Sequence, residues 1–203
     1  MQDLHEQFGN IDIYLFDQLL RGRFQPGMSV ADMGCGGGRN LVYLLRNGYH
    51  VFGVDVDPAA IQAIRRIAAA LAPGLPADNF RAEPIEQTTI PPAVADVAIS
   101  SAVLHFARDD AQFEGMLTAS WRVLKPGGMF FCRLASSIGI EDRVDLSAGR
   151  RCWLPDGSER YLVDEPLLMS LTARLGGELL DPLKTTVVQQ QRAMTTWVLR
   201  KHA

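Results

Sequence analysis

Short apolar runs alternate along this chain with longer segments in which apolar residues recur every three or four positions. The short runs predict buried strands, and the longer segments predict amphipathic helices. Helices are expected over residues 3–21 and 39–46, and three more begin at the capping residues Asp57, Asp109 and Asp164. A chain that alternates strand and helix in this way indicates an α/β fold with a parallel sheet covered on both faces. The predicted strands of this alternation cover residues 29–33, 50–55, 79–82, 96–101 and 129–134.

The end of the chain departs from this alternation. Two strand-like segments, residues 178–189 and 192–200, are joined by the short polar stretch Gln189–Gln191. This connection is too short for the crossover helix that parallel neighbours require, so it predicts an antiparallel hairpin. Together with the five strands before it, the pattern predicts a doubly wound, seven-stranded and mostly parallel sheet that ends in this hairpin.

The loop after the first predicted strand carries the clearest chemical signal. Asp32 lies at the end of that strand, glycines follow at 34, 36 and 38, and the second predicted strand ends in Asp55. Glycines let the backbone approach a ligand closely, and a carboxylate in this place can accept both hydroxyls of a ribose. The arrangement therefore predicts a nucleoside-cofactor site at the carboxyl ends of the first two strands.

Two classes of cofactor compete for this site. A dinucleotide fingerprint requires Gly-x-Gly-x-x-Gly, but Arg39 stands where the third glycine belongs. Asp32 beside the turn also suits an ammonium group better than a pyrophosphate. S-adenosylmethionine (SAM) carries an ammonium group and no phosphate, so the sequence favours SAM over NAD. An NAD(P)-binding oxidoreductase and a non-catalytic SAM-binding module are the alternative interpretations.

Composition narrows the class of protein further. The 203 residues, 47% of them hydrophobic, predict one domain over residues 1–203 with a full core. A net charge of −3 gives no general attraction for nucleic acid, and no apolar run reaches the roughly 20 residues that cross a bilayer. The three cysteines match no zinc spacing, and the N-terminus is unlike a signal peptide. We therefore expect a cytoplasmic protein that binds neither nucleic acid nor membranes.

Several motifs read together resemble the class I SAM-dependent methyltransferases. The Gly34 loop is similar to the first motif of that family, residues 95–106 to its fourth motif, and residues 121–128 to its Leu-Lys-Pro-Gly-Gly turn. The run Gly-Cys-Gly-Gly-Gly-Arg-Asn is also similar to the tellurite-resistance-type branch. The resemblance covers residues 28–201 and implies a Rossmann-like domain that transfers a methyl group from SAM to an acceptor.

The resemblance assigns the methionine and ribose parts of SAM to the first two strands. It implies that the methionine part lies against Gly34 and Gly36, that Asp32 helps to hold its ammonium group, and that Asp55 binds the ribose. Arg39 begins a predicted helix, where a cation is unfavourable beside the helix dipole, and this indicates an anionic neighbour. We therefore expect Arg39 to pair with the carboxylate of SAM.

The remaining cofactor contacts are expected at the third and fourth strands. The family pattern places an acid near the adenine, and Glu83 fits best, although Pro84 follows it and cannot donate a hydrogen bond. A shifted register would make Glu86 the acid. Ser100 and Ser101 end the fourth predicted strand, where the family contacts SAM and faces the acceptor.

Methyl transfer from a sulfonium ion is an in-line displacement, so the protein mainly aligns the nucleophile, the methyl group and the sulfur. His105, just past the fourth strand, is the candidate base. Motifs of amino-methylating nucleic-acid enzymes and metal-dependent catechol-type enzymes are absent, which favours a small-molecule acceptor and no metal. Selectivity is expected from an N-terminal helical lid at residues 1–27 and a substrate-side insert at residues 136–163. The candidate acceptor-binding residues are Tyr14, Arg133 and Tyr161.

Overall fold

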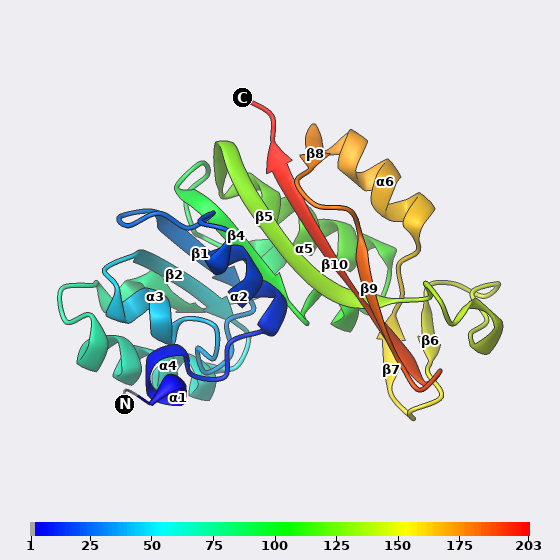
Figure 1. Ribbon diagram of the computed structural model, residues 1–203, viewed down its shortest axis with the longest axis horizontal. Coiled ribbons are helices and arrows are strands. Elements are labelled where there is room, and N and C mark those ends of the chain that lie inside the picture. The colour runs from blue at the N-terminus through cyan, green and yellow to red at the C-terminus, as the bar shows by residue number, and fades with distance from the viewer. Residues whose placement is uncertain (1–2) are drawn as a thin grey trace.

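The computed structural model describes residues 3–203 and contains an eight-stranded mixed sheet (Figure 1). The strand order is β3-β2-β1-β4-β5-β10-β8, and β9 pairs with β10 beyond the end of β8. The strands β1 to β5 run parallel, and β10 runs antiparallel to β5. The strands of the sheet are β1 (Ser29–Met33), β2 (His50–Asp55), β3 (Phe80–Ala82), β4 (Ala95–Ser101), β5 (Leu124–Ser136), β8 (Gly177–Leu179), β9 (Lys184–Val188) and β10 (Arg192–Lys201).

Helices cover both faces of this sheet, as the sequence predicts. Buried side chains of α2 (Ile13–Leu20), α3 (Val42–Arg46) and α4 (Pro58–Leu71) pack on one face. Those of α5 (Asp110–Arg122) and α6 (Glu165–Arg174) pack on the other face. Because successive side chains of a strand point to opposite faces, β5 contributes to both of these cores.

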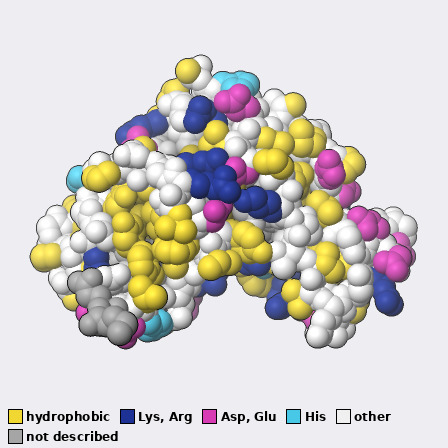
Figure 2. All heavy atoms as spheres, in the orientation of Figure 1, with side chains coloured by type: hydrophobic (Ala, Val, Ile, Leu, Met, Phe, Trp, Pro, Cys, Tyr) yellow, Lys and Arg dark blue, Asp and Glu magenta, His cyan; other side chains and the backbone are white. Residues whose placement is uncertain are grey.

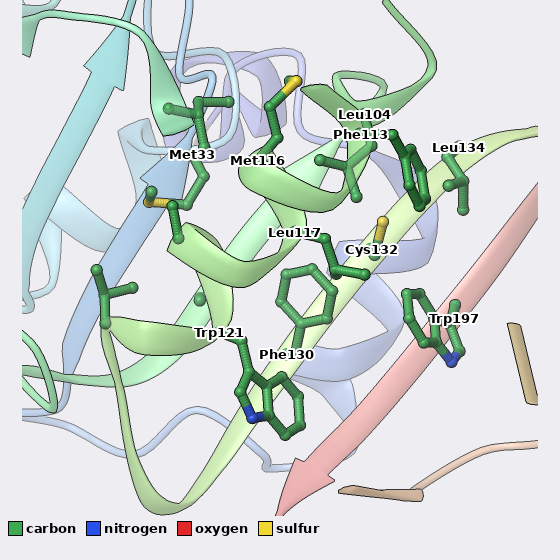
Figure 3. Packing of buried hydrophobic residues seen from close by; sticks show 14 of the residues in the cluster. Met33, Leu104, Phe113, Met116, Leu117, Trp121, Phe130, Cys132, Leu134 and Trp197 are labelled. Atoms are coloured by element: carbon green, nitrogen blue, oxygen red, sulfur yellow. The ribbon is translucent and has the colours of Figure 1, made fainter. Parts of the chain in front are cut away.

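The core beneath α5 is built around one aromatic ring. Figure 3 shows Leu117 and Trp121 of α5 beside Phe130 of β5, with Trp197 of β10 near the same ring. The rings of Trp121 and Trp197 meet Phe130 edge-to-face, with centroid distances of 6.1 and 5.9 Å. This is a favoured arrangement for aromatic pairs, so it fixes α5 and β10 against the centre of the sheet.

The predicted helix caps are confirmed. Asp57, Asp109 and Asp164 each accept a backbone N–H from the first turn of α4, α5 and α6. The predicted helix over residues 3–21 is wrong in one respect, because it is two helices, α1 (Leu4–Phe8) and α2. Gly9 ends α1 in a left-handed conformation with φ +61°, which turns the chain before α2 begins.

The C-terminal hairpin is also confirmed, but the strand count is corrected from seven to eight. Gln189 and Gln190 both have positive φ in the three-residue turn between Val188 of β9 and Arg192 of β10. The predicted strand 178–189 is divided into β8 and β9 by residues 180–183, which include Pro182. Within the predicted insert, β6 (Arg151–Trp153) and β7 (Glu159–Tyr161) form a separate two-stranded ribbon.

This topology brings the carboxyl ends of β1, β2 and β4 to one edge of the sheet. In open α/β sheets, ligands bind at that edge, where the order of the strands reverses. The segment that contains α1 and α2 lies over the same part of the molecule (Figure 1). None of the helices within residues 3–203 has the length and apolar character needed to cross a membrane.

Candidate active site

A cavity of about 1200 Å³ lies at this edge of the sheet. Its walls come from the glycine loop after β1, the end of β2, the loop after β3, the end of β4 and the N-terminal segment. Figure 2 shows the molecule hollowed along its lower edge, between the lobe of α1 to α4 and the lobe of β6 and β7. The cavity volume suits a ligand of nucleoside size together with a second small molecule.

The glycine loop is shaped so that its backbone forms the wall of the cavity. Gly34 has φ +94°, and a Cβ atom there would lie within 2.5 Å of Val103. Gly38 has φ +87°, and a Cβ atom there would overlap the buried side chain of Ile64. Only glycine combines these dihedrals with such close packing, so both backbone conformation and the available space require glycine at these two positions.

Asp55 lines the cavity and is half-buried. Its Oδ2 accepts the N–H of Gly36 at 2.8 Å, and its Oδ1 accepts the N–H of Asp57 at 3.0 Å. These bonds orient the carboxylate toward the loop, and each oxygen keeps acceptor capacity for a further donor. The structure thus places the Asp55 carboxylate beside the backbone of Gly36.

Asp32 is buried beneath the same loop. Within the described chain, neither of its carboxylate oxygens has a hydrogen-bond partner. Burial raises the pKa of Asp32 to about 7; the nearby Arg39 lowers it, and Asp55 raises it further. A buried carboxylate without a partner is costly, so it indicates a site that a cation or donor of a ligand completes.

The structure separates the two candidate acids near the adenine position. Glu83 does not line the cavity, and its carboxylate accepts bonds from Thr88 and Thr89 in the following loop. Burial would raise the pKa of Glu83, but these hydrogen bonds lower it below its usual value. Glu86 lines the cavity and accepts a bond from Gln112 at 2.8 Å. The arrangement therefore favours the shifted register.

The two serines at the end of β4 point in different directions. Ser101 lines the cavity, and its hydroxyl accepts a bond from Nη2 of Arg39 at 3.2 Å. Ser100 is fully buried and does not line the cavity, because neighbouring residues of a strand face opposite sides. Arg39 also lines the cavity and is half-exposed.

A network around Asp12 joins the N-terminal segment to the sheet. The Asp12 carboxylate accepts the Ser101 hydroxyl at 3.0 Å and lies 3.3 Å from Nη1 of Arg133 and 3.9 Å from Nη2 of Arg39. Its backbone N–H donates to Asn40 Oδ1 at 3.0 Å. The segment before α2 is thereby fixed over the carboxyl ends of β4 and β5. The sequence signal that could have indicated this role is an aspartate at the N-cap of α2.

Tyr14 and Arg133, two predicted acceptor-binding residues, meet beside this network. The Arg133 guanidinium lies over the Tyr14 ring at 5.0 Å from its centroid, and the Tyr14 hydroxyl bonds to Thr186 of β9. Neither side chain is among the residues that line the cavity. They join α2 to β5 and β9, so the structure gives them a place in holding the N-terminal segment against the sheet.

Tyr161 and His105 are in the core and not in the cavity wall. The ring of Tyr161 stacks on Phe113 of α5 at 4.5 Å, which corrects its prediction as an acceptor contact. His105 Nδ1 accepts the N–H of Ala135 at 3.1 Å. Burial lowers the pKa of His105 to about 3, and Arg160 and Arg133 lower it as well. A neutral, buried ring of this kind gives no support to the predicted base.

Sequence reasoning missed part of the cavity wall. Ala102 has φ +62° directly after β4, an unfavourable conformation for a residue with a Cβ atom, and it lines the cavity. Phe106, Gln112 and Met116 also line it, although no local pattern separates them from ordinary core or helix residues. Within residues 3–203, no group of three or more His, Cys, Asp or Glu side chains could hold a metal ion.

Comparisons with known proteins agree with this geometry. A family model described as a methyltransferase domain matches residues 31–132, half of the chain. The chain is 32% identical over 146 residues to a ubiquinone biosynthesis O-methyltransferase from Methylobacterium sp. (strain 4-46), with 70% of this chain and 56% of the relative covered. The chain spans about half the length of the curated relatives it matches.

Two solved structures share the fold. A SAM-dependent methyltransferase from Methanosarcina mazei has a TM-score of 0.70 and 20% identity, covering 91% of this chain and 97% of that chain. The 1,6-didemethyltoxoflavin-N1-methyltransferase of Burkholderia thailandensis has a TM-score of 0.68 and 21% identity, covering 93% of this chain and 76% of that chain. Because the family model spans half of the chain and the fold agrees with it, this chain belongs to the class I SAM-dependent methyltransferase family.

Proposed function

We propose that this protein transfers a methyl group from SAM to a small-molecule acceptor. The single observation that carries the proposal is the buried, unpartnered Asp32 carboxylate directly before the glycine loop, together with Asp55, which lines the cavity beside that loop. Two carboxylates around a glycine loop suit an ammonium group and a ribose, and they would repel a pyrophosphate. This favours SAM over NAD at the site.

The residues present fit each part of the cofactor. Asp32 would hold the ammonium group, Asp55 the ribose hydroxyls, and Arg39 the carboxylate. Glu86, beside the apolar Ile85, would contact the adenine. SAM supplies an electrophilic methyl group on a positively charged sulfur, so the reaction as proposed requires no metal.

The contribution of the protein is positioning and the exclusion of water. The N-terminal segment, held to Ser101 by Asp12, contributes His5, Gly9 and Asn10 to the wall of the cavity. When bound, SAM would supply the methyl group and would leave as S-adenosylhomocysteine with the carbon–sulfur electron pair, and any acceptor proton would be released to bulk solvent with the product. We assign His105 a structural role, because its Nδ1 holds the backbone of β5. Alignment alone can lower such a barrier by roughly 7–11 kcal/mol in favourable systems.

The relatives support a small acceptor. The ubiquinone biosynthesis O-methyltransferases among them are named for a small-molecule pathway. The Burkholderia enzyme was solved with 1,6-didemethyltoxoflavin and S-adenosylhomocysteine. We also propose a cytoplasmic location, which suits the free thiols of Cys35, Cys132 and Cys152.

Isothermal titration calorimetry with SAM, S-adenosylhomocysteine and NAD tests the proposal. We expect the two sulfur nucleosides to bind and NAD to show no binding. Asp55→Ala should weaken S-adenosylhomocysteine binding about 100-fold or more, which is about 2.7 kcal/mol. Asp57→Ala is the matched control, because it removes the neighbouring carboxylate that caps α4 and costs only about 1 kcal/mol of stability.

Two results would contradict the proposal: binding of NAD in preference to SAM, or an Asp55→Ala protein with unchanged affinity. Transfer of labelled methyl groups to a panel of small hydroxyl, amine and thiol acceptors tests the catalytic part. Binding of both sulfur nucleosides without any transfer would favour a non-catalytic SAM-binding module.

A further inference from the structure

Among the residues that line this cavity, Phe106 is unusual for its exposure. It lies in the short turn after β4 (η3, Leu104–Phe106), and 57% of its surface is exposed although it is a large apolar residue. Its two neighbours in the same turn, Leu104 and His105, are buried. Because this exposed residue lines the cavity, it presents apolar area to whatever enters there.

The β6–β7 ribbon fixes this ring from behind. The guanidinium of Arg160 on β7 lies 4.9 Å from the centre of the Phe106 ring, and the His105 ring meets it edge-on at 4.5 Å. Arg151 on β6 donates to the backbone oxygens of Phe106 and Ala107 at 3.2 and 2.8 Å. The ribbon therefore supports both the backbone and the ring of Phe106, so the ring is held in place before any acceptor binds.

The cation also changes what the ring attracts. A guanidinium stacked on an aromatic face is attracted by the negative electrostatic potential of that face, and its positive charge makes the potential of the ring less negative. The remaining surface of Phe106 is then better suited to an electron-rich ring than an unpaired phenyl group would be. Arg160 places a positive charge against this ring, while Asp55 and Glu86 line the proposed nucleoside side of the cavity.

We infer that Phe106, backed by Arg160, is a stacking surface for the acceptor, and that the acceptor is a planar, electron-rich aromatic compound. This inference rests on the proposed function, because it concerns the second substrate of the same cavity. It makes Phe106 a specificity-determining residue. It also gives the insert at residues 136–163 a definite role, since both supporting arginines belong to its ribbon.

The test compares two probes of similar size that differ in planarity and aromaticity. Protein saturated with S-adenosylhomocysteine is titrated with 2-naphthol and with trans-decahydro-2-naphthol, and binding is measured by calorimetry. We expect 2-naphthol to bind about three- to tenfold more tightly, the range of a favourable aromatic pair. Phe106→Leu keeps an apolar side chain but removes the ring, so this preference should disappear. Arg160→Met should reduce the preference without changing the Phe106 ring.

Trp153→Leu is the matched control. Trp153 is an aromatic residue of the same ribbon, 68% exposed, but it does not line the cavity. The preference for 2-naphthol should survive in this variant, and thermal unfolding checks that all three variants are folded. Equal affinities of the two probes for the native protein, no binding of 2-naphthol, or an unchanged preference in Phe106→Leu would each overturn the inference.

The preliminary titration with S-adenosylhomocysteine separates the two proposals. Absent binding in that step contradicts the proposed function itself. Normal binding followed by equal affinities of the two probes overturns only the stacking surface at Phe106.

Discussion

Two buried aspartates at the same edge of the sheet differ in their hydrogen bonding. Asp12, on the N-terminal segment, is surrounded by Ser101, Arg133 and the backbone N–H of Tyr14. Asp32, at the end of β1, has no hydrogen-bond partner among residues 3–203. Both side chains are almost inaccessible to solvent, so burial alone does not explain the difference.

The comparison separates a structural carboxylate from one suited to a ligand. A buried charge is tolerated when it is paired, and the groups around Asp12 provide that pairing from the chain itself. Around Asp32 the glycine loop provides only backbone and space, and the pKa of Asp32 rises accordingly. The hydrogen bonds of Asp12 are therefore complete in the protein alone, whereas we expect those of Asp32 to be completed by the cofactor.

The largest expected effect comes from Asp12→Ala. This change leaves the mostly buried Arg133 without its carboxylate and removes the N-cap of α2, so we expect a loss of about 4 kcal/mol of unfolding free energy. Urea denaturation measures it. Asp17→Ala is the control, because its partner Arg21 and Asp17 itself are both well exposed, and that loss should be under about 1 kcal/mol. Similar losses in the two variants would remove the distinction drawn for Asp12.

The second-largest expected effect is a pH-dependent difference in unfolding free energy between the native protein and Asp32→Asn. The pKa of Asp32 is raised by burial from 3.8 to about 7 in the folded state. The native protein then holds the proton more tightly than the unfolded chain, so stability is lost as pH rises from about 4 to 7. Relative to Asp32→Asn, the ligand-free native protein should lose about 3 kcal/mol between pH 5 and pH 8.

Urea denaturation of both proteins at the two pH values measures this difference. Asp78→Asn removes an exposed carboxylate and is the control for a general charge effect. Parallel pH profiles for the native protein and Asp32→Asn would mean that Asp32 is satisfied in solution, which would remove the contrast with Asp12. Asp32→Asn should also bind S-adenosylhomocysteine more weakly, because a neutral amide replaces the partner of its ammonium group.

The smallest expected effect is an absence of titration at His105. Burial, Arg160 and Arg133 lower its pKa to about 3, so its ring should stay neutral from pH 8 to pH 5. Nitrogen-15 NMR of the histidine rings checks this, with His105→Asn used to assign the signal. An inflection between pH 5 and pH 8 would restore His105 as a candidate base and would place a titrating group on the acceptor side.

The fold was largely predictable because most of its signals are local. The strands β1 and β2 and the caps at Asp57, Asp109 and Asp164 follow from apolar runs and from side chains that bond within their own helix turn. The division of the N-terminal helix depended on one glycine with positive φ. Glycine also occurs inside helices, so the presence of Gly9 in the sequence did not by itself reveal the break between α1 and α2.

The candidate site was predictable in part. Asp32, Gly34, Gly36 and Asp55 lie close together in sequence and meet through one parallel strand pair. In contrast, Glu83 is engaged by Thr88 and Thr89, an interaction set by the loop after β3. A shift of a few residues in such a loop decides which acid reaches the cavity, and no periodic pattern records it.

By itself, the sequence determined the alternation of elements, the glycine loop and the two carboxylates at the ends of neighbouring strands. These follow from backbone conformation and hydrophobic periodicity, which act over a few residues. Only the tertiary structure decided that Asp12 joins the N-terminal segment to β4 and β5, that His105 and Tyr161 are in the core, and that Phe106 lines the cavity. Those outcomes depend on contacts between segments far apart in the chain, where packing and burial, and not residue type, select the partner of each side chain.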